Sequence, residues 1–299
     1  MQKPSVILTG ATGLVGSRFV ELYSERFEIH NLDLATGVDI TDPAGVEAFI
    51  KAHPATSLIH LAAFTDTTKA ESEAGNPEGI CYRVNVVGTK NIADSCRDHN
   101  IFMIHVSTDF VFDGTKTEPY LESDPRSPLG WYGTTKALAE ETVEKSGAKY
   151  AIARLSYPYR ANFALKPDII QKILDGLKNG NLTPRFSDTT ITPTFVDDIA
   201  QGFATLIDTQ LPGIYHLVGD TSLSPYELAQ LVARTYGYDE KLVIASSLTE
   251  YEKTNRNSFM HNGSMSNQAT KDALNLSFKS VADGIAEVIK QQLWKNYFT

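Results

Sequence analysis

The chain has 299 residues, of which 42% are apolar and 21% are charged, and its formal net charge is −9. This length and composition predict a globular protein with one large α/β domain or two closely associated ones. The negative charge argues against a nucleic-acid partner and against binding to an anionic membrane surface. No apolar run is long enough to span a bilayer and no signal-peptide pattern precedes the first strand, so we expect a cytoplasmic protein without a membrane partner.

A glycine-rich turn at residues 9–16 joins the first predicted strand to the first predicted helix, which begins at Leu14. Gly10, Gly13 and Gly16 stand three residues apart. Glycines at this spacing provide a turn with positive φ, close approach of the backbone to a pyrophosphate and tight packing of helix on strand. The free N–H groups of the first helical turn then face the phosphates. The turn predicts a dinucleotide site, with an ordinary surface turn as the alternative.

The second predicted strand, residues 27–33, ends on Asp33. We expect this carboxylate beside an adenosine ribose, where it accepts hydrogen bonds from both hydroxyls and repels a 2′-phosphate. An ordinary turn residue at the strand end is the alternative. Asp39 and Ile40 precede a helix capped by Asp42, and we expect them beside the adenine. The expected cofactor is NAD or NADP, with NADH favoured.

The third predicted strand, residues 57–63, ends in small residues, so that a cofactor can lie against its backbone at Ala62 and Ala63. His60 stands in the same apolar run, and we interpret it as a core histidine with satisfied hydrogen bonds rather than as a base. A predicted helix from about residue 80 to residue 99 leads to the fourth strand, residues 101–106. Strands that alternate with helices predict an α/β fold with a doubly wound parallel sheet, whose ligands bind beyond the carboxyl ends of the strands.

Ser107, Thr108 and Asp109 lie at such a strand end, although these residue types also cap turns and helices. Further along the chain, Tyr132 and Lys136 stand at i and i+4 on one face of a predicted helix. An ammonium group lowers the tyrosine pKa from its usual value near ~10 by favouring the phenolate, so the pair can act as a general acid. Taken alone, this spacing fits a solvated surface pair better.

The same predicted helix carries an acidic run, Glu140, Glu141 and Glu144, which we interpret as a solvated face. The βαβ pattern loosens beyond about residue 160. We therefore predict a dinucleotide-binding domain at residues 1–160, with a returning segment near 194–220, and a smaller, mainly substrate-binding lobe at 161–299. Asp197 and Asp198 are predicted to cap a helix, and residues 213–218 are predicted to form a strand that returns to the main sheet.

The glycine triplet, Ser107-Thr108-Asp109 and Tyr132-x-x-x-Lys136, in this order, resemble the extended short-chain dehydrogenase/reductases. Within them the chain is most similar to the dTDP-4-dehydrorhamnose reductase family, through residues 62–65, 69–71, 106–114 and 128–133. The resemblance implies that Thr108, Tyr132 and Lys136 are catalytic. It also implies a reaction in which hydride passes from nicotinamide to C4 of the sugar while Tyr132 protonates the carbonyl oxygen. Thr108 hydrogen-bonds the same oxygen, and Lys136 binds the nicotinamide ribose and lowers the tyrosine pKa.

The glycine turn, the strand ends and the resemblance together give the expected cofactor contacts: Gly10, Thr12, Gly13, Leu14, Val15, Asp33, Asp39, Ile40, Leu61, Ala62, Ala63, Ser107, Tyr132 and Lys136. The implied substrate is a nucleotide-linked 4-keto-deoxysugar, and the expected assembly is a monomer or a homodimer. The alternatives are a sugar-nucleotide epimerase or dehydratase, and a cofactor-binding regulatory subunit like the partner of methionine adenosyltransferase. Phe110 follows Asp109 where related dehydratases have a second acid, which argues against dehydration.

Three features depart from the family pattern. Tyr157 stands where relatives usually have a Trp, and residues 259–264 replace an Arg-Pro segment that helps to hold the nucleotide. Arg18 stands where some bacterial members have an acidic metal ligand, so we expect no metal. One or two basic residues are expected to contact the substrate diphosphate, from a set that includes Arg160, Lys166, Arg185 and Arg256.

Overall fold

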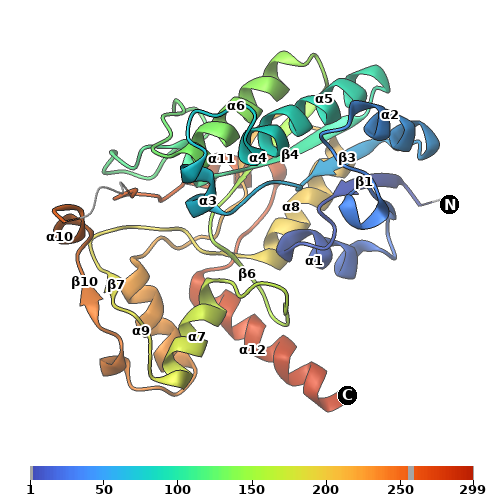
Figure 1. Cartoon of the computed structure of the whole chain (residues 1–299). Helices are drawn as coiled ribbons and strands as arrows, with labels where there is room; N and C mark the ends of the chain where they lie inside the picture. Colours follow the sequence, from blue (N-terminus) through green and yellow to red (C-terminus); the bar gives the residue numbers. More distant parts are fainter. Residues whose placement is uncertain (1–2, 255–258, 299) are drawn as a thin grey trace. The chain divides into compact units, whose positions relative to one another are not determined.

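The computed structural model describes residues 3–254 and 259–298 (Figure 1). The chain forms two compact units. The first comprises Met1–Asp113, Glu122–Arg154 and Ala200–Tyr215, and the second comprises Gly114–Leu121, Leu155–Ile199 and His216–Thr299. The assignment of residues 161–299 to substrate binding stays a prediction.

The first unit is built on a six-stranded sheet with the order β2-β1-β3-β4-β5-β9. Strands β2, β1, β3 and β4 pair in parallel, and the fold class predicted from the sequence is confirmed. The inner strands are continuous apolar runs because both faces of the sheet are covered. The strands are β1 (Ser5–Thr9), β2 (Glu28–Asn31), β3 (Ser57–His60), β4 (Phe102–Thr108), β5 (Tyr150–Leu155) and β9 (Gly213–His216).

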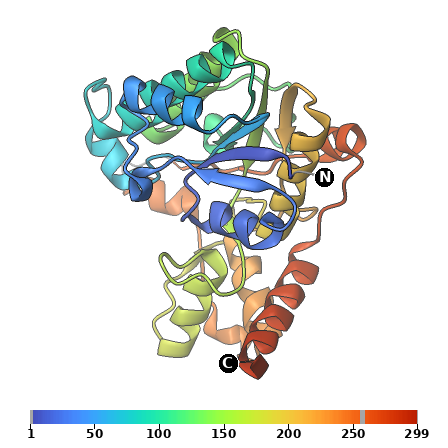
Figure 2. The ribbon, with the colours of Figure 1, turned by 90° about the vertical axis from the view of Figure 1, so that its right-hand side faces the viewer.

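Helices cover the two faces of this sheet (Figures 1 and 2). Helix α1 (Leu14–Tyr23) packs beside α8 (Val196–Thr209), and the rings of Phe19 and Phe203 meet edge to face at 6.3 Å. The opposite face carries α2 (Pro43–Ala52), α5 (Thr89–Asp98) and α6 (Trp131–Lys145). The sheet is therefore wound on both sides, and the carboxyl ends of its central strands are free to carry a site.

The helix predicted from residue 80 to residue 99 is present, but it contains a π-helical segment. Helix α4 (Ile80–Tyr82) continues through Arg83–Gly88, which is π-helical, into α5. Asn85 in this segment is buried, and its Oδ1 accepts a hydrogen bond from the Phe64 N–H at 2.8 Å. The extra residue in the turn thereby fixes the chain that follows β3. A short helix, α3 (Thr67–Ser72), comes directly after that chain.

In the second unit, α7 (Ile169–Asn179), α9 (Pro225–Thr235) and α12 (Val281–Phe298) pack around a shared apolar core (Figure 2). Ser224 caps α9 in a reciprocal capping box with Glu227. Short parallel pairs join β6 to β8 and β7 to β10. The remaining elements are β6 (Pro158–Tyr159), β7 (Arg185–Phe186), β8 (Thr194–Phe195), β10 (Ala245–Ser246), α10 (Leu248–Glu252) and α11 (Gln268–Leu274).

Two predictions about the later chain have different outcomes. The returning strand is confirmed, because β9 lies beside β5 in the main sheet. The capping role of Asp197 and Asp198 is wrong, because both lie inside the first turn of α8. Asp198 instead accepts hydrogen bonds from the backbone N–H and the Nζ of Lys279, at 2.7 and 3.0 Å. Within the described ranges, no helix combines the length and the apolar character needed to cross a membrane.

Candidate functional site

The glycine turn after β1 has little room for side chains at two of its three glycines. Gly10 has φ +70°, and a Cβ there would lie 2.9 Å from the Ala62 nitrogen. A Cβ at Gly16 would lie 2.3 Å from the Gly10 oxygen. At Gly13, by contrast, the nearest described atom beyond its chain neighbours and helix is the Gly10 oxygen, at 3.2 Å. The positive φ at Gly10 and the close packing at Gly16 are as predicted, and the approach of a pyrophosphate at Gly13 stays a prediction.

The end of β3 is fixed by hydrogen bonds from Thr9. Its Oγ1 accepts from the N–H groups of Leu61 and Ala62, at 3.1 and 3.0 Å, and lies 2.8 Å from His60 Nδ1. A hydroxyl that accepts twice donates its own proton, so Nδ1 is the acceptor and Nε2 carries the imidazole proton. Nε2 lies 3.1 Å from Thr89 Oγ1. Burial and then the charge of Lys136 lower the pKa of His60 to about 3, which confirms a neutral core histidine.

Asp33 does not end a strand, because β2 stops at Asn31. It caps a short 3-10 helix, Leu34–Thr36, and its Oδ1 accepts from the Ala35 and Thr36 N–H groups at 2.9 and 3.3 Å. The residue is 8% exposed, and Oδ2 is buried without a hydrogen-bond partner among the described residues. One carboxylate oxygen therefore has a local structural role, and the contact of the other with a ribose stays a prediction.

Asp39 and Ile40 follow in the same loop. Asp39 is exposed, and its Oδ1 accepts hydrogen bonds from the backbone N–H and the hydroxyl of Thr41, at 2.8 and 2.9 Å. Ile40 is buried against the π-helical segment, where a Cβ on Gly88 would lie 2.6 Å from its Cδ1. Their position beside an adenine stays a prediction.

The three residues predicted to be catalytic converge where β4 ends beside α6. The Thr108 hydroxyl donates to Asp109 Oδ1 at 2.8 Å, and its oxygen accepts from the Phe110 N–H at 3.3 Å. The ring of Phe110 meets the edge of Tyr132 at 5.6 Å. Lys136 is 3% exposed, and its Nζ donates to the Val106 carbonyl oxygen at 2.7 Å, two residues before Thr108.

The protonation of this cluster differs from the sequence-based expectation. Burial, followed by the negative charge of Asp109, raises the pKa of Tyr132, and a hydrogen bond with Thr108 opposes the rise. Lys136 does not lower the tyrosine pKa here, since its ammonium group is directed to the Val106 carbonyl. Burial lowers the pKa of Lys136 itself to about 8, and the negative charge of Glu140 opposes this shift. The phenol is thus a proton donor at neutral pH.

The interpretation of Glu140 as part of a solvated face is wrong. Its side chain has no exposed surface, and its oxygens accept from Arg154 Nε and Nη2 at 2.9 and 2.8 Å. Glu141 and Glu144 remain 43% and 29% exposed, so the acidic run divides between interior and surface. The missed signal was a single arginine in the apolar run of β5, which requires a buried partner.

The basic residues proposed for a diphosphate lie in the second unit. Arg160 is buried, and its Nε donates to the Ala161 oxygen at 3.0 Å. Lys166 is exposed, and burial lowers the pKa of Arg185. Arg256 lies outside the described residues. Tyr157, at the position of the family's Trp, has φ +40°, an unusual value for a residue with a side chain.

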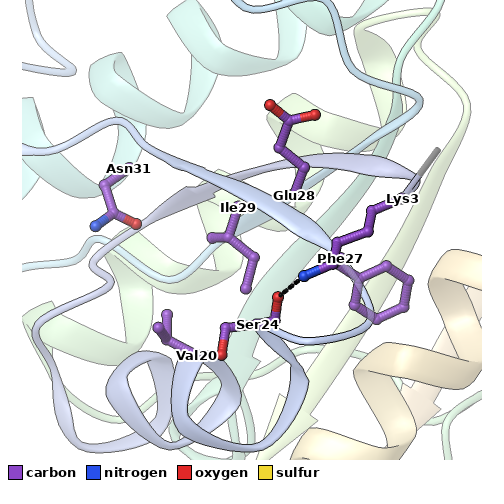
Figure 3. Close-up of a pocket in the computed structure, with 7 residues that line it drawn as sticks. All are labelled: Lys3, Val20, Ser24, Phe27, Glu28, Ile29 and Asn31. Atoms are coloured by element: carbon purple, nitrogen blue, oxygen red, sulfur yellow. Dashed lines mark hydrogen bonds between the residues drawn. The ribbon is translucent and has the colours of Figure 1, made fainter.

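A surface pocket lies beside the edge strand β2, where Lys3 Nζ donates to the Ser24 carbonyl oxygen at 3.0 Å (Figure 3). In the sheet order β2 stands three positions from β4. The predicted catalytic residues Thr108, Tyr132 and Lys136 do not line this pocket, and we therefore assign it no catalytic role. Its lining consists of Lys3, Val20, Ser24, Phe27, Glu28, Ile29 and Asn31.

A parallel sheet with a glycine turn after β1, and Thr108, Tyr132 and Lys136 gathered between β4 and α6, is the arrangement of an extended short-chain dehydrogenase/reductase. The family model described as the RmlD substrate binding domain matches residues 4–293, and the chain belongs to this family. The resemblance seen in the sequence is thereby confirmed.

Several characterised relatives cover most of this chain. A dTDP-4-dehydrorhamnose reductase from Aggregatibacter actinomycetemcomitans is 32% identical, over 75% of this chain and 76% of the relative. A dTDP-4-keto-6-deoxy-D-glucose reductase from Streptomyces niveus is 31% identical, over 78% and 79%. The methionine adenosyltransferase 2 subunit beta of Xenopus tropicalis is 29% identical, over 77% and 71%. The crystal structure of dTDP-4-dehydrorhamnose reductase from Bacillus anthracis in complex with NADP has a TM-score of 0.87 and 25% identity, covering 97% of this chain and all of that one.

Proposed function

We propose that this protein is an NAD(P)H-dependent oxidoreductase that reduces the C4 keto group of a nucleotide-linked deoxysugar. The observation that carries the proposal is the convergence of Thr108, Tyr132 and Lys136 at the carboxyl end of β4. Membership of the RmlD family and similarity to two named sugar-nucleotide reductases support the substrate class.

The residues present fit a dinucleotide. Gly13 carries no side chain at the N-terminus of α1, where the helix dipole favours a phosphate. Oδ2 of Asp33 is a buried acceptor without a partner among the described residues, as a ribose hydroxyl donor requires. The nicotinamide cofactor, when bound, supplies the hydride. We further propose that Asp33 favours NADH, because a carboxylate repels a 2′-phosphate.

The protein's own groups hold the carbonyl and move one proton. Tyr132 donates its phenolic proton to the substrate oxygen, since its raised pKa keeps it protonated at neutral pH. Thr108 donates a hydrogen bond to the same oxygen once its hydroxyl turns away from Asp109 Oδ1. Lys136 is charged below about pH 8 and donates to the ribose hydroxyls. Its bond to Val106 orients it for this contact.

The sequence also suggested two other functions, a dehydratase and a cofactor-binding regulatory subunit. A dehydratase needs a second acid after Asp109, whereas Phe110 occupies that position and packs against Tyr132. The similarity to a methionine adenosyltransferase subunit favours, as a second candidate, a regulatory subunit that binds cofactor without turnover. Both candidates share the cofactor site, so binding alone does not separate them.

The test is oxidation of NADH and NADPH, followed by absorbance at 340 nm, with dTDP-linked and other nucleotide-linked 4-keto-deoxysugars. Product analysis should show a hydroxyl at C4 and one equivalent of oxidised cofactor. Tight cofactor binding without oxidation across the substrate panel would replace the reductase proposal with the regulatory one.

A further inference from the structure

The buried residue Glu140 lies on α6 one turn beyond Lys136, on the face that carries the proposed catalytic residues. Tyr132, Lys136 and Glu140 stand four residues apart, so their side chains lie on one face of the helix. Glu140 and Lys136 are 0% and 3% exposed. Of the groups that act on Lys136, the carboxylate of Glu140 is the strongest that favours its charged form.

Arg154 on β5 holds Glu140 through two parallel hydrogen bonds, from Nε to Oε1 and from Nη2 to Oε2. Its own side chain is 1% exposed. A bidentate pair of this kind fixes both distance and orientation. Arg126 adds a contact of 3.2 Å to Oε2 and also binds Glu144 near the surface. The carboxylate is therefore ionised, held by cations and unable to turn toward solvent.

Arg154 also contacts the chain that follows Thr108. Its guanidinium group lies 5.0 Å above the ring centroid of Phe112, which is 1% exposed. Its Nη1 donates to the Glu122 carbonyl oxygen at 3.3 Å. One arginine thus touches both the helix that carries Tyr132 and the segment that begins at Thr108.

The other titratable groups around Lys136 do not replace this charge. His60 on β3 and His105 on β4 are fully buried, and burial holds the pKa of each below its usual value, so both are neutral near pH 7. Burial raises the pKa of the Cys81 thiol on α4, and that of Tyr132 is raised as well. Among these groups, only Lys136 titrates between pH 6 and about 9, and only Glu140 carries a negative charge throughout that range.

We propose that Glu140 and Arg154 are positioning residues, which hold the Lys136 ammonium in its active state and fix the Thr108 segment against α6. The inference rests on the proposed function, because it assigns Lys136 its role in that reaction. Neither residue needs to touch substrate or cofactor. Glu140 acts by favouring the charged form of Lys136, and Arg154 acts by packing against Phe112 in the segment that follows Thr108.

The test is the pH dependence of NADH affinity, measured by fluorescence titration between pH 6 and 9 on the whole chain. Affinity should fall as Lys136 loses its proton near pH 8. Glu140→Gln should move this midpoint to lower pH. A shift of about one pH unit reduces the charged fraction at pH 8 from half to about a tenth, which weakens binding about fivefold there. Glu144→Gln is the matched control, because Glu144 shares Arg126 but not Arg154.

Glu140→Gln leaves Arg154 buried without its carboxylate, which can prevent folding. The double variant Glu140→Met and Arg154→Met removes both charges and keeps apolar volume, and it should shift the midpoint in the same direction by a smaller amount, because the positive charge of Arg154 is lost as well. An unchanged midpoint in this double variant, or an equal shift in Glu144→Gln, overturns the inference. Lys136→Met should abolish the midpoint altogether, and a midpoint that persists in it also overturns the inference. A shifted midpoint with no keto-sugar turnover in the wild type refutes the proposed reaction and leaves the positioning role standing.

Discussion

A side chain at Gly13 would have fewer close neighbours than one at Gly16. Substitutions at the two positions therefore test cofactor binding and protein stability separately. A Cβ at Gly13 has only the Gly10 oxygen nearby among described atoms, at 3.2 Å. We therefore expect Gly13→Val to fold, while its side chain occupies the surface proposed for a pyrophosphate. A Cβ at Gly16 would lie 2.3 Å from the Gly10 oxygen and 3.0 Å from Ala11 Cα, so Gly16→Ala must displace the turn itself.

The magnitudes follow from these contacts. At a free concentration of ~100 times the dissociation constant, a cofactor stabilises the wild type by about 2.7 kcal/mol. At roughly 2 °C per kcal/mol for a chain of this size, that is a rise of about 5 °C in Tm. Gly13→Val should lose this rise, and the Tm of the free protein should fall slightly, because the Gly10 oxygen must move and Val caps a helix less well than Gly. For Gly16→Ala, overpacking of about 1–3 kcal/mol exceeds the helix propensity gained, about 1 kcal/mol at most, so its Tm should fall without any ligand.

Thermal unfolding with and without NADH or NADPH measures both effects in one experiment. Gly13→Val with the full ligand-induced rise would refute the placement of the pyrophosphate at this turn. Gly16→Ala with an unchanged Tm would instead contradict the close packing of α1 on the turn. The two outcomes are independent, since one concerns the ligand and the other the free protein.

Tyr132→Phe should lower turnover roughly 10²–10⁴-fold with little change in cofactor affinity, because it deletes only the donated proton; near-normal turnover would exclude Tyr132 as the acid. Lys136→Met should weaken both turnover and cofactor binding, and equal affinity in titrations would remove its ribose contact. Asp33→Ala should narrow the preference for NADH over NADPH, and a wild type that prefers NADPH tenfold, about 1.4 kcal/mol, would contradict that role. Arg154→Met should lower the free energy of unfolding by about 3–5 kcal/mol in denaturant titration, because the buried Glu140 loses its bidentate partner and keeps only the contact with Arg126, and a loss below ~1 kcal/mol would argue against that pairing.

The sheet was predictable because its inner strands are buried on both faces and appear as continuous apolar runs. The ends of those strands were less predictable. The second run was expected to end at Asp33, whereas β2 stops at Asn31 and Asp33 caps the next turn. The backbone hydrogen bonds that end a strand depend on its neighbours, and those neighbours are distant in the sequence. The π-helical segment at Arg83–Gly88 leaves no periodic signal for the same reason.

In the candidate site, the i,i+4 spacing predicted that Tyr132 and Lys136 share one helix face. It did not predict the buried groups that control their protonation. An i,i+4 pair fixes which side chains share a helix face, not whether that face meets water or a sheet. Glu140 was placed in solvent because its neighbours are acidic, and only its pairing with Arg154 on β5 shows that it is internal. The same lack of tertiary context made the ammonium of Lys136 look like the group that tunes the phenol.

The site instead separates the tasks of its two titrating groups. Tyr132 lies in surroundings that disfavour its anion, which suits a group that must give a proton and regain it in each turnover. Lys136 lies in surroundings that disfavour its cation, so its charge near neutral pH depends on a nearby carboxylate. Glu140 supplies that carboxylate, and Arg154 and Arg126 keep it ionised. In the proposed reaction, a phenol that is hard to ionise and an ammonium that is held charged are therefore both present before substrate binds.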